Sequence, residues 1–397
     1  MRDRAESSAR WAAIAIGFFV PISVALDNAL MLAVLILWLA GGRFAEKYRI
    51  IRENPVAIAA FSLFCMLAIG MFWGSAPLSV ALGTLGKYID LLFVPIFITL
   101  FEDPASRRNA MRAFLASMLL TLLLSFLIRL GFLHANSILR GLQSNPFVFK
   151  QYVTQNFFMS FAAMMLASLA LRAEGAGERA LWILLAALAT INVLFMVQGR
   201  IGYLVIAMLL LYLFMSRFGF RGLVAGLVAT SLLASVAYYG SGEFRTRVST
   251  ATSELRHWHR GQATEETNSI GSRLEFYTNT LSIIRDHPFS GVGTGGFEAA
   301  YAGKVKGTGM LATRNPHDEF LLVTVQTGIS GFLLMLLLFY TQWKHSARLP
   351  VEQKFLGRGL VLAMISGCLF NSFLLDHAEG LFFAWMSGVL FSGRRNG

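Results

Sequence analysis

The stretch TRNPHDEFL, residues 313–321, joins a long polar loop to an apolar run that extends to residue 343. Asn315 is a residue type that caps helices, and Pro316 suits the first helical position, where its missing N–H removes no intrahelical bond. The stretch therefore predicts a helix capped by Asn315, with His317 in its first turn. Unpaired N–H groups and the helix dipole favour an anion there and disfavour a charged imidazole. We expect a neutral His317 beside an anion site, which is the arrangement that a general base requires.

The composition around this stretch is that of a polytopic membrane protein. Of the 397 residues, 56% are hydrophobic and 14% are charged, whereas a soluble domain carries about 25% charged residues. The sequence predicts an all-α fold in one integral membrane domain: helices 1–9 in residues 1–240, a polar loop at 241–316, and helices 10–12 in residues 317–397. About twelve apolar segments approach the roughly 20 residues that cross a bilayer, and they lie near residues 11–26, 28–40, 55–73, 77–100, 112–132, 154–171, 180–197, 201–215, 221–239, 318–343, 355–374 and 378–391.

Lys and Arg residues concentrate in alternate loops. The short turns near Asp27 and Gly74 carry almost none. Because basic loops stay in the cytoplasm, this alternation predicts that both termini are cytoplasmic. The formal net charge of +12 then reflects topology, and no binding to nucleic acid is expected. The basic inner loops hold Arg43, Lys47, Arg49, Arg52, Arg107, Arg108, Arg112, Arg172, Arg179, Arg217, Arg221, Lys344, Arg348, Lys354 and Arg358.

Two outer segments carry cations against this pattern. The segment 133–152 holds Arg140, Lys150 and Gln151. Long loops escape the positive-inside rule, so the cations of loop 241–316 are compatible with an outer location. Their clustering needs another explanation, and binding of an anionic substrate is the simplest one. Within this loop, 272–287 has the pattern of an amphipathic helix on the membrane face. The loop cations are Arg245, Arg247, Arg256, Arg260, Arg273, Arg285, Lys304, Lys306 and Arg314.

Two arginines are candidates for binding the anion. Arg200 follows a tight outer turn and begins the eighth apolar segment, and Arg273 lies in the amphipathic loop helix. The ordinary interpretation makes Arg200 an interfacial side chain that extends to water and Arg273 a salt-bridge partner. The functional interpretation is a phosphate clamp, because a planar guanidinium matches two phosphate oxygens at once. His317 could equally be an ordinary surface histidine, and the adjacent Asp318 and Glu319 would raise its pKa or orient its ring.

Other polar features have competing interpretations. The segment GVGTGG at 291–296 matches G-x-G-x-x-G, but no βαβ unit surrounds it, so a dinucleotide fold is excluded and we expect a turn whose N–H groups face an anion. Lys87 and Asp90 lie one turn apart in an apolar segment, where mutual neutralisation is favoured over a functional site. We expect the polar turn of Asp376, His377 and Glu379 to reach the outer cavity.

The sequence predicts no metal site and no cofactor. It contains no D-x-D or H-E-x-x-H motif and no close set of His and carboxylate ligands on the predicted outer face, and such sets are what metal sites require. It also contains no Walker motif, which excludes an ATP-driven pump of that class.

Three short motifs resemble those of the O-antigen ligase and polymerase superfamily. The run NPHDEFL at 315–321 resembles the family's H-[N/S/D]-x-[F/L]-L signature, and QGRIGY at 198–203 resembles [S/G]-R-[T/S/G]-G. The segments SRLEFY and DHPFSGVGTGGF, within 272–297, resemble its loop signature. Ile201 and Asp318 depart from the commonest residues at their places. The order of the motifs and the predicted topology extend the resemblance over nearly the whole chain.

The resemblance implies a GT-C-like glycosyltransferase of the bacterial inner membrane. It would transfer a glycan from undecaprenyl diphosphate to lipid A-core at the periplasmic face, inverting the anomeric carbon, among membrane lipids and with no metal or cofactor. His317 would be the catalytic base, and Arg200 and Arg273 would bind the diphosphate. Secondary candidates for the site are Arg140, Lys150, Gln151, Arg314, Asp318 and Asp376.

Alternative functions stay open. Within the superfamily, the acceptor could be another lipid-linked glycan, as for a polymerase, or a protein serine, as for an O-oligosaccharyltransferase; the compact loop favours the ligase. A different class is a transporter or flippase for an anionic lipid, with Lys87 and Asp90 as its midplane site. The one-sided cations and the lack of an internal repeat argue against transport.

Overall fold

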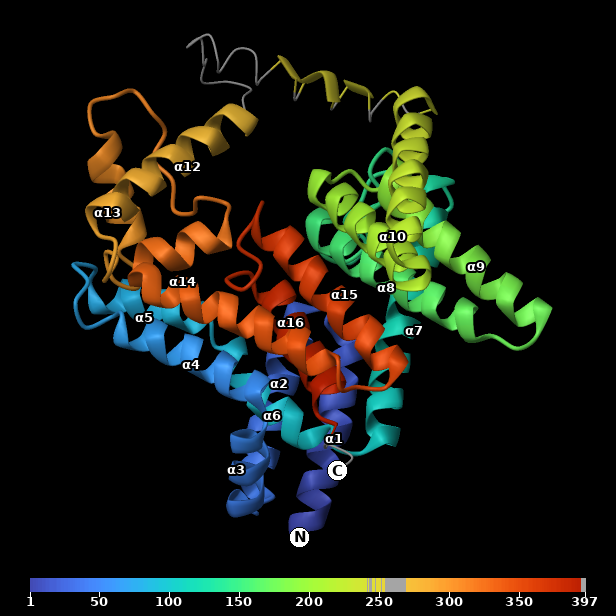
Figure 1. The fold of residues 1–397 in the computed structure, drawn as a ribbon, viewed down its shortest axis with the longest axis horizontal. Coiled ribbons are helices and arrows are strands. Elements are labelled where there is room, and N and C mark those ends of the chain that lie inside the picture. Colours follow the sequence, from blue (N-terminus) through green and yellow to red (C-terminus); the bar gives the residue numbers. More distant parts are fainter. Residues whose placement is uncertain (241, 243–244, 247, 251, 254–268, 394–397) are drawn as a thin grey trace.

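The computed structural model describes residues 1–240, 242, 245–246, 248–250, 252–253 and 269–393. Within these residues every named element is a helix, and an isolated bridge joins Leu142 to Asn145. The helices (Figure 1) are α1 (Arg2–Phe19), α2 (Val24–Ala40), α3 (Phe44–Glu53), α4 (Pro55–Ile69), α5 (Leu78–Lys87), α6 (Asp90–Leu100), α7 (Pro104–Arg129), α8 (Tyr152–Arg172), α9 (Ala176–Ile191), the π-helical turn η1 (Asn192–Met196), α10 (Arg200–Gly240), α12 (Ser269–Asp286), α13 (Phe297–Val305), α14 (Glu319–Ser346), α15 (Val351–Cys368) and α16 (His377–Phe391).

Each predicted apolar segment contains a helix or part of one, although several segments extend past a helix end. Within the described residues, six helical stretches could cross a membrane by length and hydropathy, one of them α5 and α6 together, or seven if α2 and α3, bent by 115°, form one span. The protein is therefore an α-helical multi-pass membrane protein. Several helices, such as the 15-residue α4, are too short to meet that criterion alone, so the count of twelve stays a prediction.

The segments 201–215 and 221–239 form two arms of α10, because the chain reverses at Gly219, whose φ is 59° and ψ is −139°. Gly222 and Gly226 of the second arm then pack against the first arm, at Phe214 and Leu211. Positive φ is readily accessible only to glycine, so Gly219 is the residue that permits the reversal.

The C-terminal helix α16 forms the centre of the molecule. All its residues from Ala378 to Phe391 are buried, as expected for a helix that is apolar on every side. Trp385 donates from Nε1 to the carbonyl of Ala13 in α1 at 2.7 Å. The Phe382 ring packs at centroid distances of 4.9–5.7 Å against Phe114, Phe157, Phe158 and Phe161. These contacts join α16 to α1, α7 and α8 in one core.

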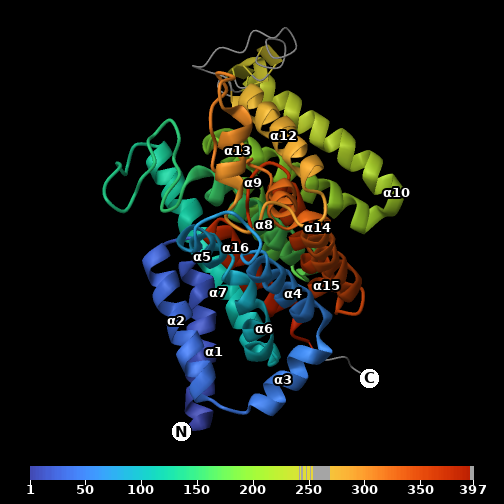
Figure 2. The same ribbon diagram turned by 90° about the vertical axis from the view of Figure 1, so that its left-hand side faces the viewer.

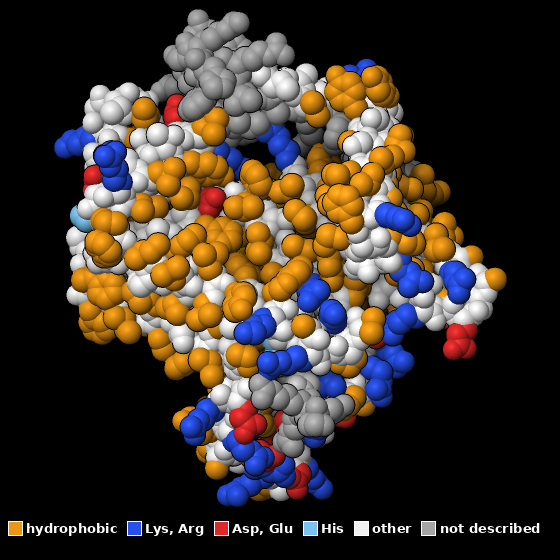
Figure 3. Space-filling view, viewed as in Figure 1, with side chains coloured by type: hydrophobic (Ala, Val, Ile, Leu, Met, Phe, Trp, Pro, Cys, Tyr) orange, Lys and Arg blue, Asp and Glu red, His pale blue; other side chains and the backbone are white. Residues whose placement is uncertain are grey.

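Contacts at the two ends of the helices join segments that the charge pattern assigns to the same side. Among the predicted inner loops, Arg172 forms a bidentate ion pair with Glu352, with both N–O distances 2.6 Å. Among the predicted outer segments, Trp73 donates from Nε1 to the carbonyl of Ser290 at 2.8 Å. Figure 3 shows Lys and Arg side chains gathered at the lower end of the molecule and on its right-hand side, apart from a broad hydrophobic face. Which end faces the periplasm stays a prediction.

The predicted amphipathic helix at 272–287 is confirmed as α12. With α13 it lies at the end of the molecule opposite the N-terminus (Figure 2). Of the loop cations, Arg247, Arg256 and Arg260 lie outside the described residues. The two helices cover the start of α14, where the candidate site lies.

Candidate functional site

The helix α14 begins later than the sequence predicts. Asn315 does not cap it: its Oδ1 accepts from the N–H of His317 and the hydroxyl of Ser372, each at 2.8 Å. Asp318 is the cap instead, accepting from the N–H of Leu321 at 2.9 Å. An Asn side chain that bonds the backbone two residues on forms an Asx turn, and this turn displaces the predicted first helical turn. His317 consequently precedes the helix.

The backbone of His317 is strained and held in place. Its φ of 60° lies in the left-handed region, which costs a residue with a Cβ about 1–2 kcal/mol. Its N–H bonds to Asn315 as described, and its carbonyl accepts from the hydroxyl of Tyr277 in α12 at 3.2 Å. Strained residues persist where the surroundings over-determine them, often at functional sites. The strain thus fixes the direction in which the imidazole points.

A chain of side chains sets the tautomer of His317. Asn371 donates from Nδ2 to the Asp376 carboxylate at 3.0 Å, so its Oδ1 is the atom that faces His317 Nδ1, at 3.3 Å. An amide oxygen can only accept, and Nδ1 must therefore carry the proton. No described residue bonds Nε2. His317 can thus present an unprotonated Nε2 to a substrate.

Electrostatics keep this imidazole neutral. Burial lowers the pKa of His317 from its ordinary value, the hydrogen bond to Asn371 opposes this, and the Arg273 guanidinium lowers the pKa further. Arg273 therefore lies within electrostatic range of His317, a proximity that the sequence alone did not specify. Burial raises the pKa of Asp318 to about 6, against the lowering effect of backbone N–H groups at the start of α14.

A polar cavity of about 610 Å³ lies beside this chain. Asn371 and Asp376 line it together with Glu379 and the start of α8. Three secondary candidates from the sequence, Arg140, Lys150 and Gln151, line its other side. The structure therefore gathers four of the six secondary candidates around one cavity, since Asp376 is the fourth. The remaining lining residues are Ile22, Ser23, Val24, Ala25, Ser137, Ile138, Phe149, Val153, Thr154 and Ala378.

Lys150 is held by a buried partner. Its Nζ lies 2.8 Å from Asp27 Oδ2, and the two side chains are 8% and 0% exposed. A buried charge needs such a partner because its desolvation is costly. Arg140 and Gln151 also line the cavity and are exposed, so both are accessible to a bound molecule.

Arg200 begins α10, as predicted. The turn before it is held by Gln198, whose N–H donates to Asn145 Oδ1 at 2.9 Å. Gly202 packs directly on Asn156 of α8, where an added Cβ would lie 2.6 Å from the Asn156 Cβ. The spacing Arg200-x-Gly202 therefore reflects close packing: the glycine brings the N-terminus of α10 against α8, whose first turn borders the polar cavity.

Arg314 and the Lys87–Asp90 pair form contacts other than those predicted. Arg314 points to the surface, where its Nε lies 2.8 Å from Glu298 Oε1. The exposed Lys87 does not neutralise Asp90, because α5 ends at Lys87 and α6 begins at Asp90; the carboxylate of Asp90 instead lies 3.5 Å from His377 Nδ1. A one-turn spacing predicts contact only in an unbroken helix.

The N–H groups of GVGTGG bind protein, not an anion. Those of Val292 and Gly293 donate to the carbonyls of Val325 and Gln326 at 2.8 and 2.9 Å. These carbonyls lie just before the kink of α14 at Gly328, whose φ is 67°. The glycines are needed for close approach, because a Cβ on Gly291 would lie 2.5 Å from the Gln326 backbone. The segment therefore braces α14.

Sequence reasoning missed Asn371, Tyr277 and the structural role of Glu319. Glu319 is fully buried and accepts from the hydroxyl of Tyr88 at 2.7 Å and from the N–H of Leu374 at 2.9 Å. It therefore ties the start of α14 to the α15–α16 turn. Within the described residues, no group of three or more His, Cys, Asp and Glu side chains is placed to hold a metal ion.

Comparisons with known proteins cover part of the candidate site. A protein-family model, Wzy_C, described as O-Antigen ligase, matches residues 184–336. This range includes Arg200, Arg273 and His317 and ends before Asn371 and Asp376. No curated protein matches the chain. One similar solved chain comes from a structure titled "Structural coordination of polymerization and crosslinking by a peptidoglycan synthase complex", with 14% identity, a TM-score of 0.48, and coverage of 85% of this chain and 96% of that one.

Proposed function

We propose that this protein is a glycosyltransferase that moves a glycan from a polyprenyl diphosphate lipid to a hydroxyl acceptor at the outer face of a bacterial inner membrane. The observation that carries the proposal is the chain Asp376–Asn371–His317, which leaves an unprotonated Nε2 beside Arg273. The family match over residues 184–336 supports a reaction of the O-antigen ligase and polymerase type. Both termini would then lie in the cytoplasm.

In this proposal His317 acts as general base. Nε2 takes the proton from the acceptor hydroxyl as the oxygen attacks the anomeric carbon. The bond from that carbon to the diphosphate oxygen breaks, its electron pair leaves with the diphosphate, and the anomeric configuration inverts. A positioned base contributes about 10²–10⁴ in rate. The left-handed backbone and the fixed tautomer of His317 orient this base before the substrate arrives.

Arg273 and Arg200 are proposed to bind the diphosphate. Guanidinium groups can hold two phosphate oxygens each and stabilise the charge that grows on the leaving oxygen. Diphosphate is already a good leaving group, so no general acid is needed. The proximity of Arg273 to His317 supports this assignment directly, and Arg200 is supported by its place at the α10 N-terminus packed on α8.

The polar cavity is proposed to receive the acceptor. Its lining includes the exposed Arg140 and Gln151 and the Asn371 amide that orients His317. Charged and amide groups at such positions suit a hydroxylated and phosphorylated sugar, and we propose the lipid A-core of lipopolysaccharide. Lipopolysaccharide from a deletion strain tests this choice: loss of every O-chain indicates a ligase, one repeat per core a polymerase, and intact lipopolysaccharide with unglycosylated protein a protein transferase.

The reaction itself is tested with purified protein. Donor lipid and lipid A-core are mixed with the protein in the presence of a chelator and without ATP, and glycosylated product is measured by mass spectrometry. We expect product, with inversion at the anomeric carbon. Movement of the donor lipid across vesicles without covalent product would contradict the proposal and favour a transporter.

A further inference from the structure

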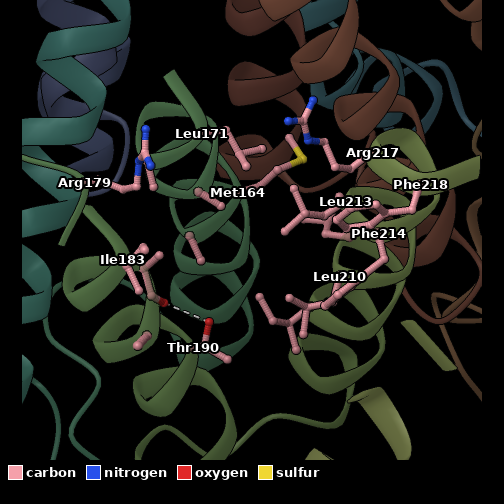
Figure 4. A pocket seen from close by; sticks show the side chains of 17 residues that line it. Met164, Leu171, Arg179, Ile183, Thr190, Leu210, Leu213, Phe214, Arg217 and Phe218 are labelled. Atoms are coloured by element: carbon pink, nitrogen blue, oxygen red, sulfur yellow. Dashed lines mark hydrogen bonds between the residues drawn. The ribbon is translucent and has the colours of Figure 1, made fainter. Parts of the chain in front are cut away.

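A second cavity, of about 590 Å³, lies between α8, α9 and the first arm of α10 (Figure 4). Its wall is aliphatic and aromatic apart from Thr190 and two arginines, Arg179 and Arg217. The hydroxyl of Thr190 donates to the Ala186 carbonyl of its own helix at 2.8 Å. The interior therefore offers apolar surface and no free polar group.

Both arginines lie at the same end of this cavity. The turn at residues 197–199 joins α9, through η1, to α10, and the two helices run in opposite directions; Arg179 is in the first turn of α9 and Arg217 ends the first arm of α10. Figure 4 shows the two guanidinium groups at one end, with Thr190 and Leu210 at the other. The helical rise from Arg179 to Thr190 is about 16 Å, close to the roughly 15 Å of hydrocarbon in one leaflet.

The two arginines are available for an external anion. Neither forms an ion pair with an acidic side chain of the described chain. Arg179 uses one nitrogen to bond the Ala173 carbonyl at 2.8 Å and is exposed. The nearby Arg172, by contrast, has both terminal nitrogens on Glu352. Arg179 and Arg217 are therefore the charged residues that line the cavity.

We propose that this cavity binds an anionic glycerophospholipid, with an acyl chain along the apolar wall and the phosphate between Arg179 and Arg217. The match between cavity length and leaflet thickness, and the cations at the headgroup level, carry this inference. The site lies at the end of α8 remote from the polar cavity, since α8 contributes Thr154 to the polar cavity and Leu171 to this one. The lipid therefore fills space between the helices without entering the proposed reaction.

Native mass spectrometry of the delipidated full-length protein tests the proposal. Phosphatidylglycerol and phosphatidylcholine of equal chain length are titrated, and the fraction of protein with bound lipid is measured for each. We expect the wild type to bind phosphatidylglycerol more tightly by about tenfold, because each Arg near a membrane surface favours anionic lipid. The double variant R179Q/R217Q should lose this preference and still bind both lipids weakly. The variant Ala187→Phe, which fills the cavity, should reduce binding of both lipids.

The matched control is R221Q, which removes an exposed cation near the same end of α10 that does not line the cavity. It should keep the tenfold preference. Equal binding of the two lipids by the wild type, or an equal loss in R221Q, would overturn the proposal. Displacement of phosphatidylglycerol by an equimolar polyprenyl phosphate would also overturn it, because the site would then belong to the donor lipid. Thermal unfolding confirms that each variant is folded.

Discussion

The helix α8 borders two cavities of similar size and opposite character. The polar cavity near its first turn measures about 610 Å³, and the apolar cavity near its last turns measures about 590 Å³. In the polar cavity, polar side chains of the wall are held by other side chains, as Asp27 holds Lys150 and Asp376 holds Asn371. In the apolar cavity, charge occurs only at one end. A reaction needs polar groups fixed before substrate arrives, whereas a lipid needs apolar length and a charge at headgroup level.

The largest effect should follow removal of the base beside the polar cavity. His317→Ala should lower the rate of glycan transfer by about 10²–10⁴-fold, the contribution of a positioned general base. The measurement is initial product formation by purified protein. The control His287→Ala removes an exposed histidine of the same loop region and should leave the rate unchanged; an equal loss in both variants would contradict the assigned role.

The next largest effect should come from the proposed diphosphate ligands. Arg273→Ala should lower the rate by about 10²–10³-fold, as removal of an electrostatic stabiliser commonly does, and Arg200→Ala should act similarly. Arg314→Ala is the matched control, because Arg314 is 85% exposed and paired with Glu298. Rates are compared at saturating acceptor. A normal rate in Arg273→Ala would contradict the proposal that Arg273 binds the diphosphate of the donor.

The buried ion pair of Lys150 and Asp27, at the wall of the polar cavity, should contribute strongly to the free energy of unfolding. Lys150→Ala leaves Asp27 buried without its cation and should cost about 3–5 kcal/mol in the free energy of unfolding. The double variant K150M/D27L should recover most of this loss, because neither charge remains. Denaturant unfolding in detergent measures it. Lys304→Ala, which breaks an exposed pair with Asp286, should cost no more than about 1 kcal/mol; a comparable cost would mean that Lys150 is not structurally special.

The smallest effect concerns the pH dependence set by Asn371. The pKa of His317 is lowered by burial, so the base stays deprotonated at neutral pH and transfer falls only when acid reaches that lowered pKa. In Asn371→Asp a carboxylate faces Nδ1 and raises the pKa, so the acid limb of kcat/KM should move up by about one unit. In Asn371→Ala the bond that raises the pKa is lost, and the limb should move down. The control Asn136→Asp, in an exposed loop, should leave the profile unchanged.

The sequence predicted helices better than it predicted contacts. Apolar runs located the long apolar helices, and an amphipathic pattern located the loop helix α12, because these depend on local composition. It failed where two local signals compete: Asn315-Pro316 and Asp318 can both begin a helix, and the Asx turn that decides between them depends on Ser372, a distant residue in sequence. Asn371 carried no signal, because its role arises from contacts with His317, 54 positions away, and Asp376.

Sequence spacing also misled at Lys87 and Asp90. Their separation suits a helical pair, but the chain between them breaks into α5 and α6, and a break is not visible in an apolar run. The motif GVGTGG is a turn, as the sequence predicted, but its N–H groups bond to protein carbonyls and not to an anion. What it approaches is the kinked backbone of α14, which no local pattern specifies.

The most direct test of the central claim is chemical rescue of His317→Ala by added imidazole. If Nε2 of His317 takes the proton from the acceptor, free imidazole that diffuses into the polar cavity should restore part of the lost transfer rate. The restored rate should rise with pH through the pKa of the added base, and Arg273→Ala should show no rescue. A His317→Ala protein that is folded and binds donor, yet gains no activity from any small base, would contradict the general-base role.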